Sequence, residues 1–202
     1  MPKKLFIKYT LQFGIKTWLK VICKKINIIR LEIVTNSDIK GKIDKLFLEA
    51  TNLIYREIYI NKIKIKTNNF NINFNFENYT LYSNNMVIKC FLEIDSRSLE
   101  KIFCKDKWQD IRKTLENEFT EGNSILNFQI NSDLINLYYQ LNDIYLNNAV
   151  TLQAKDNQLL FKGIINKKEV LLPLDKSIKI KHCKIKNELI NIELISKVNF
   201  DN

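Results

Sequence analysis

The sequence contains few of the residues that interrupt regular backbone structure. Its 202 residues include only four glycines and two prolines. Such a low share argues against a disordered or loop-rich chain. The glycines Gly14, Gly41, Gly122 and Gly163 are also too far apart to form a glycine loop that cradles phosphate.

Metal-binding and catalytic motifs are lacking as well. The four cysteines Cys23, Cys90, Cys104 and Cys183 show no C-x-x-C spacing, and His182 is the only histidine. A zinc site needs four ligands in paired clusters, so we expect no metal site. The sequence has no G-x-S-x-G or H-E-x-x-H motif. We therefore expect free, mostly buried thiols in a reducing compartment, no cofactor and no enzymatic activity.

The sequence has no uninterrupted hydrophobic run long enough for a membrane span. The most apolar N-terminal stretch, residues 5–22, is broken by Lys8, Lys16 and Lys20. These charges also exclude the apolar core of a signal peptide. We expect the protein to stay in the compartment where it is made, either soluble or peripheral to a membrane.

Positive charge exceeds negative charge, with 32 Lys and Arg against 22 Asp and Glu and a net charge of +10. This excess suits an anionic membrane surface, nucleic acid or an acidic partner. The joint over-use of Lys, Asn and Ile is typical of an AT-rich genome, and the lysines are spread along the chain. No aromatic RNA-binding motif, KH loop or zinc framework is present, so we do not expect nucleic acid as a partner.

Alternating apolar and polar residues dominate residues 58–76. Isoleucine and phenylalanine alternate with lysine and asparagine, which predicts strands with one apolar and one polar face. The phase of this alternation slips twice, which predicts a bulge at Asn61–Lys62 and a bend near Asn68–Asn69. We expect a long, bent antiparallel sheet that is covered on one face.

Residues 5–25 have the pattern of an amphipathic helix. Apolar residues that include Leu11, Ile15 and Trp18 recur at helical spacing. The other positions carry the lysines that we take as candidates for contact with a membrane: Lys8, Lys16, Lys20 and Lys24. The apolar stripe either docks on the sheet or lies on an anionic bilayer, and both can hold at once.

The remaining pattern predicts a second set of helix and strands. Asp95–Ser96 is a good helix N-cap and Gly122 a good helix end, so we expect one helix or two short ones over 96–121. Strands follow, and residues 134–145 are compatible with either helix or strand. We thus predict an α+β fold in a single domain, with a long curved antiparallel sheet wrapped around one or two amphipathic helices in two roughly similar halves.

The boundaries of this predicted domain follow from the same patterns. We expect an N-terminal amphipathic helix over 1–26 and a first half of the sheet over 27–94. A helical segment over 95–122 and a second half of the sheet over 123–202 complete the expected order.

Several segments resemble the LmeA-type phospholipid-binding family. The similar segments are W-L-K-V-I-C-K-K-I-N-I-I-R-L-E-I at 18–33, the stretches at 41–55 and 63–74, I-D-S-R-S-L-E-K-I-F-C-K-D-K-W at 94–108, and the hairpin at 150–163. The resemblance implies a fold related to tubular lipid-binding proteins, with a curved sheet around a helix and an apolar groove. It also implies phospholipid binding without catalysis, and an origin in a cyanobacterium or plastid. It assigns no individual ligand-contact residues.

We therefore expect a protein that binds phospholipid or another acyl-chain lipid in an apolar groove at a membrane surface. Ten buried methylenes would contribute roughly 8 kcal/mol before entropic losses. The candidate groove residues are Leu11, Ile15, Trp18, Phe70, Ile72, Phe74, Phe76, Phe91 and Trp108. The alternatives are that these side chains form an ordinary core, that the protein is a basic nucleic-acid-binding module, or that its groove accepts a segment of a partner protein.

Overall fold

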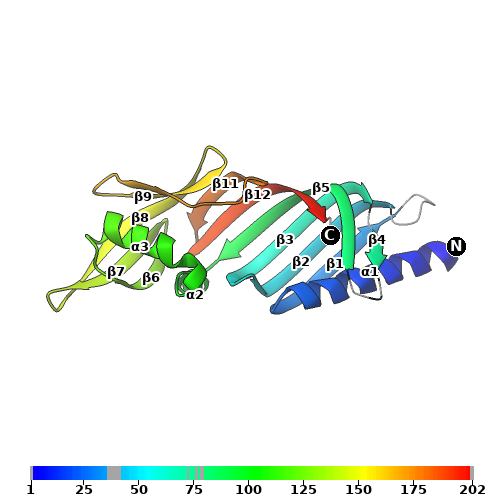
Figure 1. The fold of residues 1–202 in the computed structure, drawn as a ribbon, viewed down its shortest axis with the longest axis horizontal. Coiled ribbons are helices and arrows are strands. Elements are labelled where there is room, and N and C mark those ends of the chain that lie inside the picture. The colour runs from blue at the N-terminus through cyan, green and yellow to red at the C-terminus, as the bar shows by residue number, and fades with distance from the viewer. Residues whose placement is uncertain (1, 36–41, 72, 76, 78–79, 201–202) are drawn as a thin grey trace.

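A computed structural model describes residues 2–35, 42–71, 73–75, 77 and 80–200 (Figure 1). These residues form two open antiparallel sheets and three α-helices, which confirms the predicted α+β class. The helices are α1 (Pro2–Ile22), α2 (Ser96–Phe103) and α3 (Gln109–Phe119), with a 3-10 turn, η1 (Asp106–Trp108), before α3. The helical segment expected over 96–121 is therefore two short helices.

The first sheet has the strand order β1-β2-β3-β5-β12-β11, with β4 paired to β5. Its strands are β1 (Lys25–Val34), β2 (Lys42–Tyr55), β3 (Ile58–Asn71), β4 (Asn73–Asn75), β5 (Thr80–Ile94), β11 (Ile178–Lys186) and β12 (Leu189–Phe200). The second sheet has the order β10-β9-β8-β7-β6. Its strands are β6 (Ile125–Asn131), β7 (Leu134–Leu141), β8 (Ile144–Lys155), β9 (Gln158–Gly163) and β10 (Glu169–Leu171).

The last two strands return to the first sheet, where β12 lies beside β5 (Figure 1). This differs from the expected boundary, because residues 123–202 do not form one half of the sheet. The physical reason is that apolar residues alternate along β12 in the same phase as along β5. Ile192 pairs with Leu92 and Leu194 with Cys90, so the apolar side chains of β12 continue the buried face of β5.

The ambiguous segment 134–145 forms most of a hairpin. Strand β7 ends at Leu141 and β8 starts at Ile144, so only two residues connect them. Both of these, Asn142 and Asp143, have positive φ, at 47° and 63°. This is the backbone of a tight hairpin turn, which Asn and Asp tolerate better than most residues.

The apolar residues of β2 and β3 change phase together. The paired positions Ile43 with Phe70, Ala50 with Ile63, and Leu53 with Ile60 are all buried, although their spacing along each strand is not a strict alternation. The pairing is in constant register along the described residues of both strands, so the bulge expected at 61–62 is wrong. Asn52, between two of these pairs, instead has a left-handed φ of 51°.

Helix α1 covers the apolar face of the first sheet. Ile15 and Leu19 are buried against Leu31, Ile33 and other side chains from β1, β2, β3 and β5. The amide of Gln12 also donates a hydrogen bond of 3.0 Å to the carbonyl oxygen of Leu31. The apolar stripe predicted for the N-terminal helix therefore docks on the sheet.

A second core joins α2, α3 and the second sheet to β11 and β12. The rings of Phe103 and Phe128 stack at 4.8 Å between centroids, and Phe161 is completely buried beside them. Burial of one such side chain contributes about 1.5–3 kcal/mol. Because β11 belongs to the first sheet, this core links the two sheets.

The left-handed backbone at Asn52 leads to a stability prediction. Replacing Asn52 by valine should lower the free energy of unfolding by about 1–2 kcal/mol, because a β-branched residue is strained at positive φ. Asn52→Gly should preserve or raise it. Urea denaturation measures both. Asn68→Val, at an exposed position of β3, is the control, and equal losses in Asn52→Val and Asn68→Val would contradict this account.

Candidate functional site

Four of the candidate groove residues lie together between α1 and the first sheet. Ile15 is 5% exposed and Phe70 is 4% exposed, and Leu11 and Trp18 pack against the same cluster, partly buried. These side chains come from positions 11–70, and the docking of α1 on the sheet brings them together. In this arrangement the four side chains belong to one packed cluster.

Two other candidates, Phe91 and Trp108, lie away from this cluster. Phe91 pairs with Lys64 and Glu193 on the opposite face of the sheet. Trp108 packs on the second core, where its ring and that of Phe103 are nearly perpendicular at 6.4 Å between centroids. Ile72 and Phe76 lie outside the described residues, and Phe74 lies in the short strand β4.

Two pockets of the described residues lie away from α1. One, of about 300 Å³, is beside Phe47 on the face of the sheet opposite α1. The other, of about 630 Å³, lies between the turns at Ser132–Asp133 and Asn187–Glu188. An acyl chain could occupy the cluster around Ile15 and Phe70 only after α1 moves away from the sheet, because the side chains are already in contact.

The solvent-facing side of α1 carries large apolar side chains that the sequence analysis missed. Tyr9 is 60% exposed, Phe13 63% and Val21 65%. Tyr9 and Phe13 are four residues apart and so lie on one side of the helix. The sequence contains this aromatic pair at helical spacing. Only the structure shows that the side of α1 with Ile15 and Leu19 is the buried one.

Lysines lie among these exposed side chains. Lys8, Lys16, Lys20 and Lys24 are all exposed, as expected for the candidates for membrane contact. Helix α1 contains no acidic residue, and none of these four lysines forms an ion pair with a described residue. We call Tyr9, Phe13, Lys16, Lys20 and Val21 the exposed face of α1. It combines apolar rings with cations that have no neighbouring acid on the helix.

Asp95 organises the junction between β5 and α2. Its carboxylate accepts hydrogen bonds from the backbone N–H of Ser98 at 2.7 Å and from the Asn61 amide at 2.5 Å. The Asn61 carbonyl oxygen in turn accepts from the backbone N–H of Asp95 at 2.9 Å. Burial raises the pKa of Asp95, but the hydrogen bonds from Ser98 and Asn61 outweigh burial and lower it overall. The predicted N-cap is confirmed, and its role is structural.

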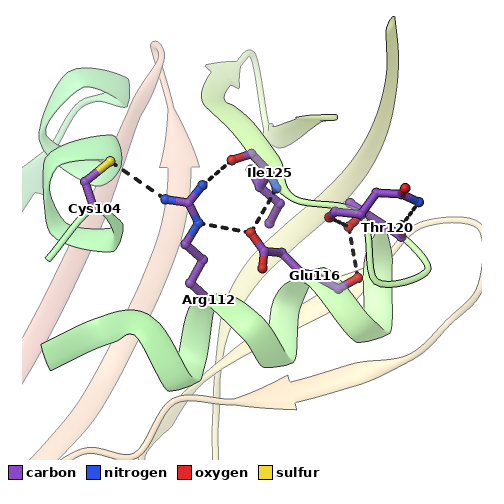
Figure 2. A network of polar contacts seen from close by, with 6 residues as sticks. Cys104, Arg112, Glu116, Thr120 and Ile125 are labelled. Atoms are coloured by element: carbon purple, nitrogen blue, oxygen red, sulfur yellow. Dashed lines mark hydrogen bonds and ion pairs between the residues drawn. The ribbon is translucent and has the colours of Figure 1, made fainter. Parts of the chain in front are cut away.

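Arg112 and Glu116 of α3 hold the start of β6 (Figure 2). Glu116 accepts a hydrogen bond from Arg112 Nε at 3.0 Å and another from the backbone N–H of Ile125 at 2.9 Å. Arg112 donates to the carbonyl oxygen of Ile125. Because β6 is at the edge of its sheet, this pair occupies backbone groups that could otherwise bind another strand. The side chains of Arg112 and Glu116 are therefore both hydrogen-bonded to the backbone of β6.

The described residues contain no group of three His, Cys, Asp or Glu that could hold a metal ion. His182 is exposed on β11. None of the helices in the described ranges is long and apolar enough to cross a membrane.

No protein-family model, curated protein or solved structure matches this chain.

Loss of Asp95 should destabilise the protein in a pH-dependent way. Asp95→Ala should lower the free energy of unfolding by about 1 kcal/mol at neutral pH, since a helix cap is lost. The pKa of Asp95 is lower in the folded state, so its stabilisation is present above the unfolded value of 3.8 and fades as pH falls through the folded value. Urea denaturation between pH 7 and pH 3 should show the deficit of Asp95→Ala shrinking, unlike that of exposed Asp133→Ala. A pH-independent deficit would refute the role of the carboxylate.

The four cysteines should differ sharply in reactivity. All are free, and Cys23, Cys90 and Cys183 are buried while Cys104 is exposed. Burial raises the pKa of Cys90 and of Cys183 to about 12, which leaves little reactive thiolate at neutral pH. A thiol-reactive dye should therefore label one cysteine rapidly in the folded protein and all of them in denaturant. Cys104→Ser should abolish the rapid phase; if a rapid phase persists, the buried thiols are more accessible than this structure has them.

Proposed function

We propose that the protein is a non-catalytic lipid-binding protein that attaches to anionic membrane surfaces through the exposed face of α1. The observation that carries this proposal is the exposure of Tyr9, Phe13 and Val21 among lysines on a helix without acidic residues. Helices that lie in a membrane interface combine aromatic or aliphatic side chains with Lys and Arg in this way. Two features support a cyanobacterial or plastid membrane as the setting. They are the resemblance of the sequence to a phospholipid-binding family and an amino-acid composition typical of an AT-rich genome.

The expected energies suit reversible attachment. Transfer of three apolar side chains into the interface and approach of three or four lysines to anionic lipid contribute at most roughly 7–13 kcal/mol before the cost of association. Ile15 and Leu19, on the opposite side of α1, belong to the core and stay buried during the first contact with a bilayer. The protein can therefore bind a bilayer through α1 without unfolding.

The apolar cluster beneath α1 is the proposed acyl-chain site. Leu11, Ile15, Trp18 and Phe70 offer one continuous apolar surface, and α1 joins β1 through the short link Cys23–Lys24. If insertion of Phe13 into a bilayer draws α1 away from the sheet, a lipid tail can replace the contacts that α1 makes there. The exposed face of α1 would then contact the membrane first, and the apolar surface beneath α1 would hold the lipid tail afterwards.

Vesicle binding tests the membrane contact. The protein should float with vesicles of phosphatidylcholine and phosphatidylglycerol, and much less with phosphatidylcholine alone. The double substitution Tyr9→Ser and Phe13→Ser should weaken binding at least tenfold, because it removes the inserting rings. Tyr145→Ser is the matched control, since Tyr145 is 74% exposed at the tip of the β7–β8 hairpin.

Native mass spectrometry of the protein purified without detergent tests the lipid site, with bound phospholipid as the expected result. If no phospholipid co-purifies and anionic vesicles are not bound, the proposed function is wrong. If Tyr145→Ser weakens vesicle binding as much as the α1 substitutions do, α1 is not the contact.

A further inference from the structure

The face of the first sheet opposite α1 brings together two aromatic residues that are far apart in the sequence. On this face, which we call the outer face, Phe47 of β2 lies beside Lys66 of β3, and Phe91 of β5 lies beside Lys64. Both rings are partly buried, and neither belongs to a buried core cluster. Phe47 and Phe91 are separated by one strand and one row of side chains, and β3 contributes the lysines between them.

The surroundings of Phe47 are strongly basic. Lys66 pairs with Phe47 on one side and with Lys89 on the other, and Lys45 is the next residue of β2 on this face. Lys197 of β12 continues the basic surface. We call Arg30, Lys45, Phe47, Lys66, Lys89 and Lys197 the outer-face patch.

The two acidic residues beside Phe47 on the outer face, Glu32 and Glu49, are paired with cations, whereas Glu93 and Glu193 lie on this face beside Phe91. Glu32, the one acidic residue lining the pocket at Phe47, forms an ion pair of 2.6 Å with Arg30. Glu49, in the neighbouring row, lies 2.8 Å from Lys62 and 3.9 Å from Lys64. Lys45, Lys89 and Lys197 form no ion pair within the described part of the chain. The surroundings of Phe47 therefore keep an excess of positive charge, whereas Phe91 also has acidic neighbours.

A pocket of about 300 Å³ opens beside Phe47. The guanidinium carbon of Arg30 lies 5.3 Å from the centre of the Phe47 ring, and Lys66 Nζ lies 5.8 Å from it. Arg30 and Lys66 are exposed, so both side chains can move to admit a ligand. A base can stack on the Phe47 ring when one of these cations, which lie over the ring, moves aside.

We propose that the outer-face patch binds single-stranded nucleic acid, with a base stacked on Phe47 and phosphates held by the lysines around it. Binders of single strands combine a positively charged surface with aromatic side chains on which bases stack. Open sheets use their exposed aromatic residues in the same way for RNA. Phe91, on the same face beside Lys64, is placed to receive a second base.

The geometry favours this ligand over a bilayer. The outer face is opposite the face covered by α1, so a flat membrane in contact with Phe13 does not reach Phe47. Phe47 is also partly buried, whereas Phe13 is 63% exposed and can insert into lipid. The inference goes beyond the proposed function and does not depend on it.

Fluorescence anisotropy with a labelled oligothymidine and a labelled oligouridine tests the proposal. Binding should weaken as salt rises, because phosphate contacts release counterions. Phe47→Ala should weaken binding about tenfold or more, consistent with loss of one stacked base. Phe47→Trp should restore binding, and the fluorescence of the new indole should be quenched by the oligonucleotide. Lys66→Ala should weaken binding and reduce the salt slope by about 0.7.

Matched controls separate this site from α1 and from general charge. Phe13→Ser and Lys176→Ala, at exposed positions outside the patch, should leave oligonucleotide binding unchanged. The proposal is overturned if neither oligonucleotide binds at low salt, or if folded Phe47→Ala binds like the parent protein. It is equally overturned if polyglutamate displaces the oligonucleotide as well as unlabelled oligonucleotide does. A loss of binding to anionic vesicles in Phe47→Ala, without any effect on oligonucleotides, would assign the patch to membranes instead.

Discussion

The continuous apolar face of the first sheet depends on β2 and β3 changing phase at the same positions. If only one strand changed phase, buried residues of one strand would lie beside exposed residues of the other. Because Ala50 pairs with Ile63 and Leu53 with Ile60, both members of each pair turn inward together. Helix α1 can therefore pack along these strands, and the outer face keeps its own chemistry.

Polar contacts at the junction of the two sheets convert this packing into a defined arrangement. Asn61 lies at one of the phase changes, and its side chain binds Asp95 at the start of α2. Ser96, the next residue, accepts a hydrogen bond from the backbone N–H of Ile130 in β6 at 2.8 Å. The first sheet, the helical segment and the second sheet are thus connected through three neighbouring side chains. Burial of apolar surface favours compactness, whereas these directional bonds select one orientation.

The two sides of α1 and the two faces of the first sheet give the molecule surfaces of different character. The buried side of α1 and the inner face of the sheet form a core, whereas the outer side of α1 presents rings and lysines. The outer face of the sheet presents cations around Phe47. The net charge of +10 is not uniformly spread, since α1 contains no acidic residue and Glu32 and Glu49, beside Phe47, are paired with cations. These are the two surfaces for which we propose different anionic partners.

Local periodicity determined much of the fold from the sequence alone. It predicted the α+β class, the N-terminal helix with its apolar stripe, the cap at Asp95, and which residues of β3 turn to each face. It did not determine that β11 and β12 join the first sheet or that residues 134–145 form most of a hairpin. It also did not determine that Phe91 and Phe70 lie on different faces of the sheet, with Phe91 on the same face as Phe47. Helix and strand periods arise from neighbouring residues, but the pairing of distant strands depends on the burial available in the whole molecule. The exposure of Tyr9 and Phe13 was decided in the same way, because α1 has apolar residues on both sides and only the sheet selects which side is covered.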